Sequence, residues 1–179
     1  PNAVVVATGC YVPTATEKVV QDLSIDLVVG NNRKKDIVEI LNEYYAEKEA
    51  GEQVKEEYVI DINHTDEYED LEISTVTEHT RAHLKIQDGC NNFCSYCIIP
   101  YARGRIRSRT MESIKAELER LSASGFKEIV LTGINLSCYD DNGKKLIDVI
   151  EMADNVNGIE RIRLGSLDPE VVTEDFVER

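Results

Sequence analysis

Three cysteines fall within eight residues of this chain, at Cys90, Cys94 and Cys97, in the spacing Cys-x-x-x-Cys-x-x-Cys. Thiolates this close together can ligate three irons of a cubane iron–sulfur cluster and leave the fourth iron without a protein ligand. An open iron can bind a substrate or cofactor, whereas a fully ligated cluster can only pass electrons. The triplet therefore predicts a catalytic cluster site with all three cysteines as metal ligands.

Two other interpretations of the triplet stay open. A structural zinc site needs four ligands, usually in two separated pairs, and no histidine stands close to the triplet. Buried core thiols fit poorly because Cys94 and Cys97 flank a polar and aromatic turn. Disulfides are disfavoured by the odd count of five cysteines and by the lack of a secretory signal, which also favours a reducing, cytoplasmic location.

The net charge of −14 argues against this chain being the main nucleic-acid-binding part of a protein, since affinity for phosphates comes largely from Lys and Arg. The charge is unevenly spread. Residues 47–78 carry 12 of the 34 acidic residues, whereas residues 103–109 carry four arginines and no acid. A local contact with RNA remains compatible with this pattern. No apolar run approaches the length of about 18 residues that a membrane span requires, so we expect no membrane partner.

The first 51 residues show a β-α-β-α order, which implies a parallel sheet. The apolar run 4–7 predicts a buried strand, and 26–29 predicts a second strand. A loop over 9–13 and a short helix from Thr16 lie between them. The pattern over 35–49 predicts an amphipathic helix with these residues on one face: Ile37, Ile40, Leu41 and Tyr44. Residues 52–78 then form an acidic linker, with short apolar pieces at 58–60 and 71–73 that allow one edge strand.

The remainder reads as three β/α steps of a barrel. Strands are predicted at 82–86, 128–131 and 161–164. Two helices lie between them. The first covers 111–122, with Thr110 as its N-cap and an inward stripe of Ile114, Leu118 and Leu121. The second covers 144–153, with Leu146, Ile147 and Ile150 inward. In barrels of this kind the chemistry lies in the loops after the strands, which is where the cysteine triplet falls.

The residues around the triplet carry a family resemblance. Tyr96 precedes the third cysteine, and the chain continues Ile-Ile-Pro-Tyr-Ala-Arg-Gly-Arg-Ile-Arg-Ser-Arg over 98–109. This run resembles the radical S-adenosylmethionine (SAM) methylthiotransferases, and its residues are most similar to those of the threonylcarbamoyladenosine tRNA subgroup. The stretches at 131–137 and 161–169 resemble the same family. The resemblance implies an α/β chain that holds the end of a parallel-sheet amino-terminal domain (1–51), the linker (52–78) and the first half of a radical SAM partial TIM-type barrel (79–179). The chain is therefore expected to be a fragment of a longer protein.

The resemblance also implies the cofactors and the roles of residues. Cys90, Cys94 and Cys97 hold a 4Fe-4S cluster whose open iron binds SAM, and reductive cleavage of SAM gives a 5′-deoxyadenosyl radical. Further residues are expected to contact SAM: Tyr96, Gly133, Asn135, Ser166 and Arg109. The alternatives are loop packing for Tyr96 and a strand-ending turn for Gly133 and Asn135. The arginines at 103–109 could instead contact RNA phosphates; Arg109 is expected to be buried, whereas the other three could simply be solvated. Asp168, beside Ser166, is either a ribose contact or a helix cap.

Cys10 resembles a ligand of the family's second, auxiliary 4Fe-4S cluster, whose other two cysteines would precede Pro1; without the resemblance Cys10 is a buried thiol. Cys138 matches no motif and is treated as structural.

By resemblance, the whole protein methylthiolates the adenine C-2 carbon of threonylcarbamoyl-adenosine next to the tRNA anticodon. Its partners would be the tRNA anticodon stem-loop and an electron donor such as flavodoxin or ferredoxin. Isopentenyl-adenosine tRNA and a ribosomal-protein aspartate are the alternative substrates. An iron–sulfur electron carrier or a zinc-binding module is the alternative outside enzymes. An electron carrier should show a fourth cysteine near the triplet, and a zinc module should bind stoichiometric colourless metal.

Overall fold

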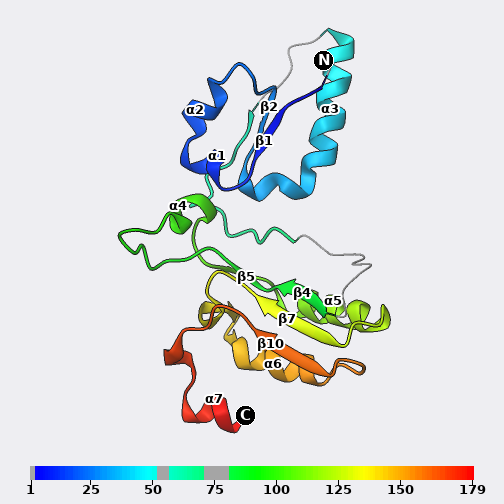
Figure 1. Cartoon of the computed structure of the whole chain (residues 1–179), viewed down its shortest axis with the longest axis vertical. Helices are drawn as coiled ribbons and strands as arrows, with labels where there is room; N and C mark the ends of the chain where they lie inside the picture. The colour runs from blue at the N-terminus through cyan, green and yellow to red at the C-terminus, as the bar shows by residue number, and fades with distance from the viewer. Residues whose placement is uncertain (1–2, 52–56, 71–80) are drawn as a thin grey trace. The chain divides into compact units, whose positions relative to one another are not determined.

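The computed structural model describes residues 3–51, 57–70 and 81–179, and the chain divides into two units (Figure 1). The first unit comprises Pro1–Leu71 with Asn91–Arg105, and the second comprises Glu72–Cys90 with Ile106–Arg179. The segment after the first cysteine of the triplet thus groups with the amino-terminal residues. The domain boundaries expected from the sequence stay predictions, and the apolar piece at 71–73 lies outside the described residues.

The first unit is built on a parallel sheet in the order β1-β2-β3. Its strands are β1 (Val6–Thr8), β2 (Leu27–Val29) and β3 (Glu57–Tyr58). The register pairs Val6 with Leu27 and Val28 with Glu57. The helical segments are α1 (Tyr11–Thr14), α2 (Thr16–Val20), η1 (Asn31–Asp36), α3 (Ile37–Ala50) and α4 (Ile99–Arg103). This arrangement confirms the predicted parallel α/β order.

Both faces of β2 are buried because its side chains alternate between two clusters. Leu27 and Val29 pack with Ile40 and Tyr44 of α3, whereas Val28 packs with residues from α1 and α2. Figure 1 shows α3 and the α1–α2 pair on opposite sides of this sheet. Gly51 ends α3 with a φ of 70°, the left-handed conformation that glycine adopts without a Cβ clash.

Two details of the first unit correct the sequence prediction. The strand predicted at 4–7 is not buried throughout: β1 lies at the edge of the sheet, and Val5, just before it, is 48% exposed. The loop predicted over 9–13 contains the helical turn α1. Pro13 is tolerated there because the first turn of a helix needs no donor from its residues.

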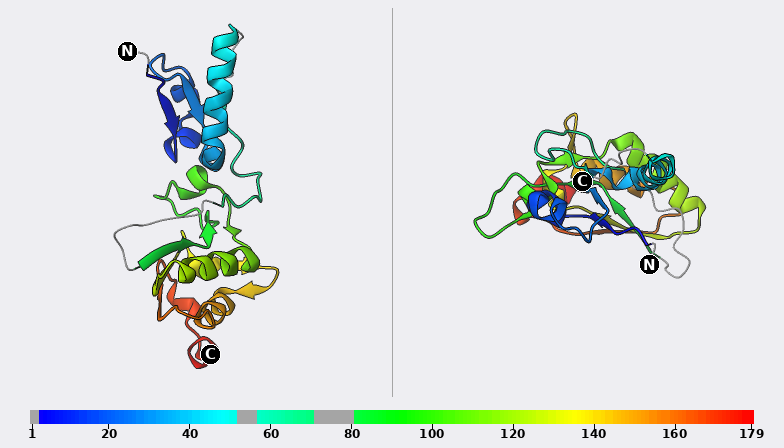
Figure 2. Two further views of the ribbon diagram at one scale, coloured as in Figure 1. Left: turned by 90° about the vertical axis from the view of Figure 1, so that its right-hand side faces the viewer. Right: turned by 90° about the horizontal axis from the view of Figure 1, so that it is seen from above.

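The second unit is a parallel sheet in the order β10-β7-β4. Its strands are β4 (Arg81–Lys85), β7 (Glu128–Thr132) and β10 (Arg161–Leu164), and Arg81 and Arg161 both pair with Glu128. Helices α5 (Met111–Ala123) and α6 (Leu146–Asp154) connect consecutive strands and lie beside one another (Figure 2). The unit ends with η3 (Pro169–Val171) and α7 (Glu174–Glu178). The three β/α steps predicted from the sequence are confirmed.

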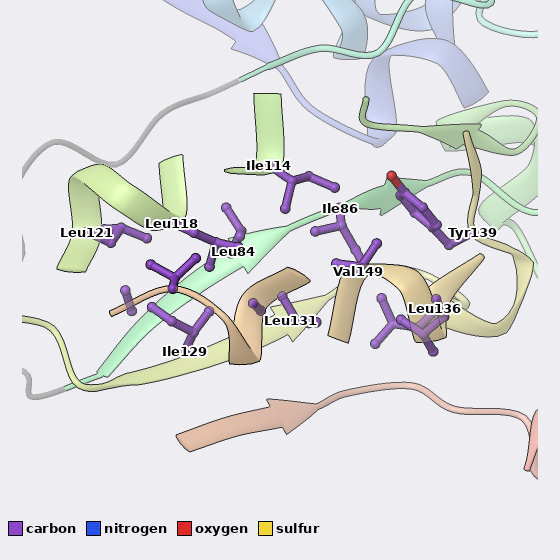
Figure 3. Packing of buried hydrophobic residues seen from close by; sticks show 14 of the residues in the cluster. Leu84, Ile86, Ile114, Leu118, Leu121, Ile129, Leu131, Leu136, Tyr139 and Val149 are labelled. Carbon is purple, nitrogen blue, oxygen red and sulfur yellow. The ribbon is translucent and has the colours of Figure 1, made fainter. Parts of the chain in front are cut away.

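One continuous apolar core holds the sheet against α5 and α6 (Figure 3). Leu84 and Ile129 from the strands meet Leu118 from α5 and Val149 from α6, and all four are 1% exposed or less. The N-cap prediction for α5 is confirmed, since Thr110 accepts a hydrogen bond from the Ser113 backbone. Among the described helices, none combines the length and the apolar composition that crossing a bilayer requires.

The second helix begins later than predicted. Lys144–Lys145 (β9) pair antiparallel with Asp140–Asp141 (β8), so these residues form a hairpin and α6 begins at Leu146. The Asn142-Gly143 turn has positive φ at both residues, as tight hairpins of this kind require. The fully buried residues of α6 are Leu146, Val149 and Ala153, while Ile147 and Ile150 are half-buried and Ile150 packs against the core.

We expect the substitution Val149→Ala to lower the free energy of unfolding by about 2 kcal/mol, because it removes two buried methyl groups and leaves a cavity in the core. The matched control is Val177→Ala in α7, where the valine is 71% exposed. That change should cost less than about 0.5 kcal/mol. Urea denaturation followed by circular dichroism measures both. Equal losses at the two sites would contradict this account of the core.

Candidate iron–sulfur and cofactor site

Three loops are tied together at the carboxyl edge of the sheet in the second unit. They follow β4, β7 and β10, and each contains residues predicted to serve the cofactor. The Leu136 backbone N–H donates to the Ser166 carbonyl (3.1 Å), and the Asp168 N–H donates to Ser137 Oγ (2.7 Å). A third link joins the loop after β4 to the loop after β7 through Gln87. The structure therefore brings the Gly133, Asn135 and Ser166 segments together at one edge.

Gln87 is the centre of this arrangement, and sequence reasoning did not single it out. Its side chain is fully buried at 0% exposure. Its Nε2 donates to the carbonyls of Asp88 (2.9 Å) and Gly89 (2.7 Å), while its Oε1 accepts from the Asn135 backbone N–H (2.9 Å). The polar position directly after the strand, between Ile86 and the cysteines, was the only signal available in the sequence.

Asp88 fixes the same short segment from its other side. Its carboxylate accepts from the Gly89 N–H (2.9 Å) and from Lys85 Nζ (3.1 Å), and its side chain is largely buried. Gln87 and Asp88 also form β5 and pair with β6 (Arg107–Ser108). Gly89 then turns with a φ of 74°, a conformation that favours glycine. The backbone leading into Cys90 is thus held by strand pairing and by two side chains.

Gly133 faces Gln87 at close range. A Cβ at this position would lie 2.9 Å from Gln87 Oε1 and 3.0 Å from a methyl of Leu136. Gln87 cannot retreat without breaking its hydrogen bonds, so the structure itself requires glycine here, whether or not SAM also approaches. The prediction that Gly133 admits the cofactor stays a prediction.

The polar residues predicted beside the cofactor also have local roles. Asn135 caps η2 (Leu136–Cys138) by accepting from the Ser137 N–H, and Asp168 caps η3 by accepting from the Glu170 N–H. These are the turn and cap alternatives weighed from the sequence. Ser166 is exposed, and its carbonyl receives the Leu136 N–H. Contacts from these side chains to SAM stay predictions.

Arg109 is buried at 3% exposure within the second unit. Its guanidinium pairs with Glu117 of α5 and donates to Ser113 Oγ (3.0 Å). The Tyr139 hydroxyl donates to the Arg109 carbonyl (2.7 Å), and burial raises the pKa of Tyr139 so that it stays a donor. Removing one partner of such a buried ion pair destabilises the protein, because the remaining charge is left buried without compensation. The predicted contact of Arg109 with SAM stays a prediction.

Cys90 and Cys138 both lie in the second unit. Burial raises the pKa of the Cys138 thiol, and the negative charges of Cys90 and Asp168 raise it further. Cys138 closes η2, the turn that begins at Asn135. The loop after β7 thus contributes a further thiol, and its surroundings favour the protonated form.

Cys94 and Cys97 belong to the first unit, where a hydrogen bond from the Cys97 N–H to the Cys94 carbonyl (2.9 Å) closes the turn between them. Phe93 precedes this turn with a φ of 47°, which is uncommon for a residue with a Cβ. Its ring meets Tyr101 edge-on (5.5 Å between centroids), and the Arg105 guanidinium lies 4.5 Å over the Phe93 centroid. The ring of Tyr96 is 92% exposed, so it does not serve loop packing within this structure.

Cys10 also lies in the first unit, directly after β1, as the N-cap of α1. Asn31 Nδ2 lies 3.9 Å from Cys10 Sγ and donates to the Ala102 carbonyl of α4 (3.1 Å). Lys34 Nζ in turn donates to Asn31 Oδ1 (2.7 Å), and Asn31 is 5% exposed. The predicted role of Cys10 as a ligand of a second cluster stays a prediction.

The donor set of the triplet suits an iron–sulfur cluster. All three cysteines are free thiols, Cys94 is exposed and the other two are half-buried, so the thiolates are accessible to iron. Across residues 3–51, 57–70 and 81–179, no three side chains of His, Cys, Asp or Glu are already gathered as an ion site. The fit therefore rests on the chemistry and spacing of the three thiols.

A family description, the radical SAM superfamily, matches residues 84–179, which is more than half of the chain. The chain belongs to the radical SAM superfamily. This membership confirms the family predicted from the cysteine triplet, and it implies a 4Fe-4S cluster and SAM as cofactors. The α/β fold class, with part of a radical SAM barrel, is confirmed as well.

Curated relatives extend the likeness over nearly the whole chain. A threonylcarbamoyladenosine tRNA methylthiotransferase of Bacillus subtilis is 37% identical over 183 residues, covering 99% of this chain and 39% of the relative. An enzyme of the same name from Aquifex aeolicus is 40% identical, covering 93% and 40%. A tRNA-2-methylthio-N(6)-dimethylallyladenosine synthase of Clostridium botulinum is 32% identical, covering 99% and 39%. The chain therefore spans about two fifths of the length of these relatives.

We expect Gly133→Ala to lower the free energy of unfolding by about 1–3 kcal/mol, the usual cost of overpacking. In the background of Gln87→Ala, which removes the obstructing amide, the same change should cost at least about 1 kcal/mol less. A double-mutant cycle by urea denaturation measures this coupling. Additive losses would show that the close approach of these two residues does not constrain the site.

Proposed function

We propose that this chain is part of an enzyme that methylthiolates the adenine C-2 carbon of threonylcarbamoyl-adenosine in tRNA. The observation that carries the proposal is the extent of the likeness. Relatives with that name match 93–99% of the chain at 37–40% identity, so the similarity covers the amino-terminal α/β unit as well as the barrel segment. A shared cluster motif alone would account only for residues around the triplet.

In this proposal Cys90, Cys94 and Cys97 hold the 4Fe-4S cluster and leave one iron for SAM. When bound, these groups supply a 5′-deoxyadenosyl radical, which an unactivated aromatic C–H requires because no acid–base route to it exists near neutral pH. The protein contributes positioning: Gln87 and Asp88 hold the backbone before Cys90, and the Asn135 and Ser166 loops border the same edge. Orienting the cofactor and excluding competing reactions is the usual contribution of such a scaffold.

The remaining partners follow from this assignment. Cys10 would ligate the auxiliary 4Fe-4S cluster that handles sulfur, with cysteines outside this chain. Because the net charge is −14, the main tRNA-binding surface would lie elsewhere in the protein, and Arg103 and Arg105 would add local phosphate contacts. Arg107 and Arg109 are buried, so they would not take part. The target base would leave the anticodon-loop stack to reach the barrel mouth. Flavodoxin or ferredoxin would supply electrons, and a reducing cytoplasm suits five free thiols.

Anaerobic reconstitution of the protein with iron and sulfide tests the cluster. We expect the dithionite-reduced protein to give a 4Fe-4S signal by EPR, and we expect the addition of SAM to change the shape of that signal. Cys94→Ser should abolish the signal, because two thiolates do not hold the cubane. The matched control, Cys138→Ser, should keep it. If Cys138→Ser removes the signal instead, Cys138 is a fourth ligand and the open iron is excluded.

The substrate is tested with the full-length protein and tRNAs that carry either modified base. We expect a methylthio product, detected by mass spectrometry of digested nucleosides, only from threonylcarbamoyl-adenosine. The second candidate substrate is dimethylallyl-adenosine, also called isopentenyl-adenosine, which the 32% identity to the Clostridium botulinum synthase favours. Product from that tRNA alone would reverse the assignment. Product from neither tRNA, but from a ribosomal protein, would reject a tRNA substrate.

A further inference from the structure

Gln87 is a buried polar side chain whose hydrogen bonds end beside the first predicted cluster ligand. We propose that Gln87 is a positioning residue for SAM binding, acting by locking the backbone before Cys90 to the loop that contains Asn135. This inference rests on the proposed function, because it assigns Gln87 a task within that same site.

The geometry of the amide supports this role. Both hydrogens on Nε2 are used, one on the Asp88 carbonyl and one on the Gly89 carbonyl, and Oε1 receives the Asn135 N–H. One side chain thus satisfies three backbone groups, in two loops separated by 48 positions in sequence. A side chain with donors alone or acceptors alone cannot make this set of contacts.

The partners of Gln87 distinguish positioning from ordinary core packing. The apolar core is formed by hydrophobic side chains, whereas the amide of Gln87 bonds to the backbone of residues that follow β4 and β7: Asp88 in the short strand β5, Gly89 and Asn135. Gly89 is the residue next to Cys90, so movement of its carbonyl displaces the ligand directly. At Asn135, the same side chain fixes the start of η2. The two predicted contacts to the cofactor, Cys90 and Asn135, therefore depend on one amide.

The test is Gln87→Glu, which keeps the shape of the side chain and the acceptor for Asn135. An ionised carboxylate turns lone pairs toward the carbonyls of Asp88 and Gly89, whereas a protonated one regains a donor. We expect the Kd for SAM, from EPR titration of the reduced cluster, to rise about tenfold at high pH. It should recover as the pH is lowered from about pH 9 to about pH 6, because protonation restores the hydrogen bond. Wild type should not show this recovery.

Two further variants complete the design. Gln87→Leu removes all three hydrogen bonds and should weaken SAM binding equally at every pH. Gln21→Glu makes the same chemical change at an exposed position after α2 and should leave SAM binding unchanged. Thermal unfolding of each variant is measured in parallel. If Gln87→Glu does not fold, Gln87→Leu decides the question, because it fills similar space without the hydrogen bonds: a Kd about tenfold higher than that of wild type supports the role, and an unchanged Kd rejects it.

The outcomes separate the inference from the proposed function. If the wild-type cluster forms but ignores SAM, the proposed function fails. If wild type responds to SAM and the Gln87 variants bind it with unchanged affinity at every pH, the positioning role is wrong, including the case in which only their melting temperature falls. A pH-dependent loss confined to Gln87→Glu supports the role.

Discussion

The buried amide of Gln87 is the interaction on which the candidate site depends. A buried amide without partners costs about 1–3 kcal/mol, so it must find both donors and acceptors nearby. Here the available partners are backbone groups of two loops. Satisfying the amide therefore fixes the loops, and the absence of a side chain at Gly133 leaves room for the amide, because a Cβ there would lie 2.9 Å from Gln87 Oε1. The segment leading to Cys90 acquires a defined backbone before any cofactor is present.

Many of the charged side chains also form contacts within their own unit. Several acidic residues are committed to neighbours within their own unit: Glu67 and Glu69 pair with Lys35 and Lys34, and Glu117 pairs with Arg109. Hydrogen bonding from Arg163 and Arg161 lowers the pKa of Glu128 at the start of β7, which stays ionised between strands β4 and β10. These acidic residues form ion pairs within the fold, so the net negative charge is compatible with a local contact between RNA and the accessible Arg103 and Arg105.

The sequence predicted the elements well where periodicity decides them. Strands β7 and β10, helix α5 and its cap at Thr110 follow from apolar spacing and a single hydroxyl, both of which are local signals. The late start of α6 was missed because pairing of Lys144 with Asp141 across a tight turn outweighs their helical pattern. The half-exposed β1 was missed because burial depends on the position of a strand in the sheet. Gln87 was not predicted as a site residue for a related reason. A glutamine after a strand is usually solvated, and only the folded loops show its partners.

Asn31 repeats in the first unit what Gln87 does in the second. It too is a buried amide, and its Nδ2 donates to the Ala102 carbonyl in the helix that follows Cys97, while it lies 3.9 Å from the sulfur of Cys10. Its Oδ1 is occupied by Lys34, so the amide cannot turn over without losing a charged donor. An aliphatic side chain of equal size would fill either space but would leave the carbonyls of Gly89 and Ala102 without these donors. In both units a buried amide thus holds backbone close in sequence to predicted cysteine ligands: Gly89 beside Cys90, and the helix that follows Cys97.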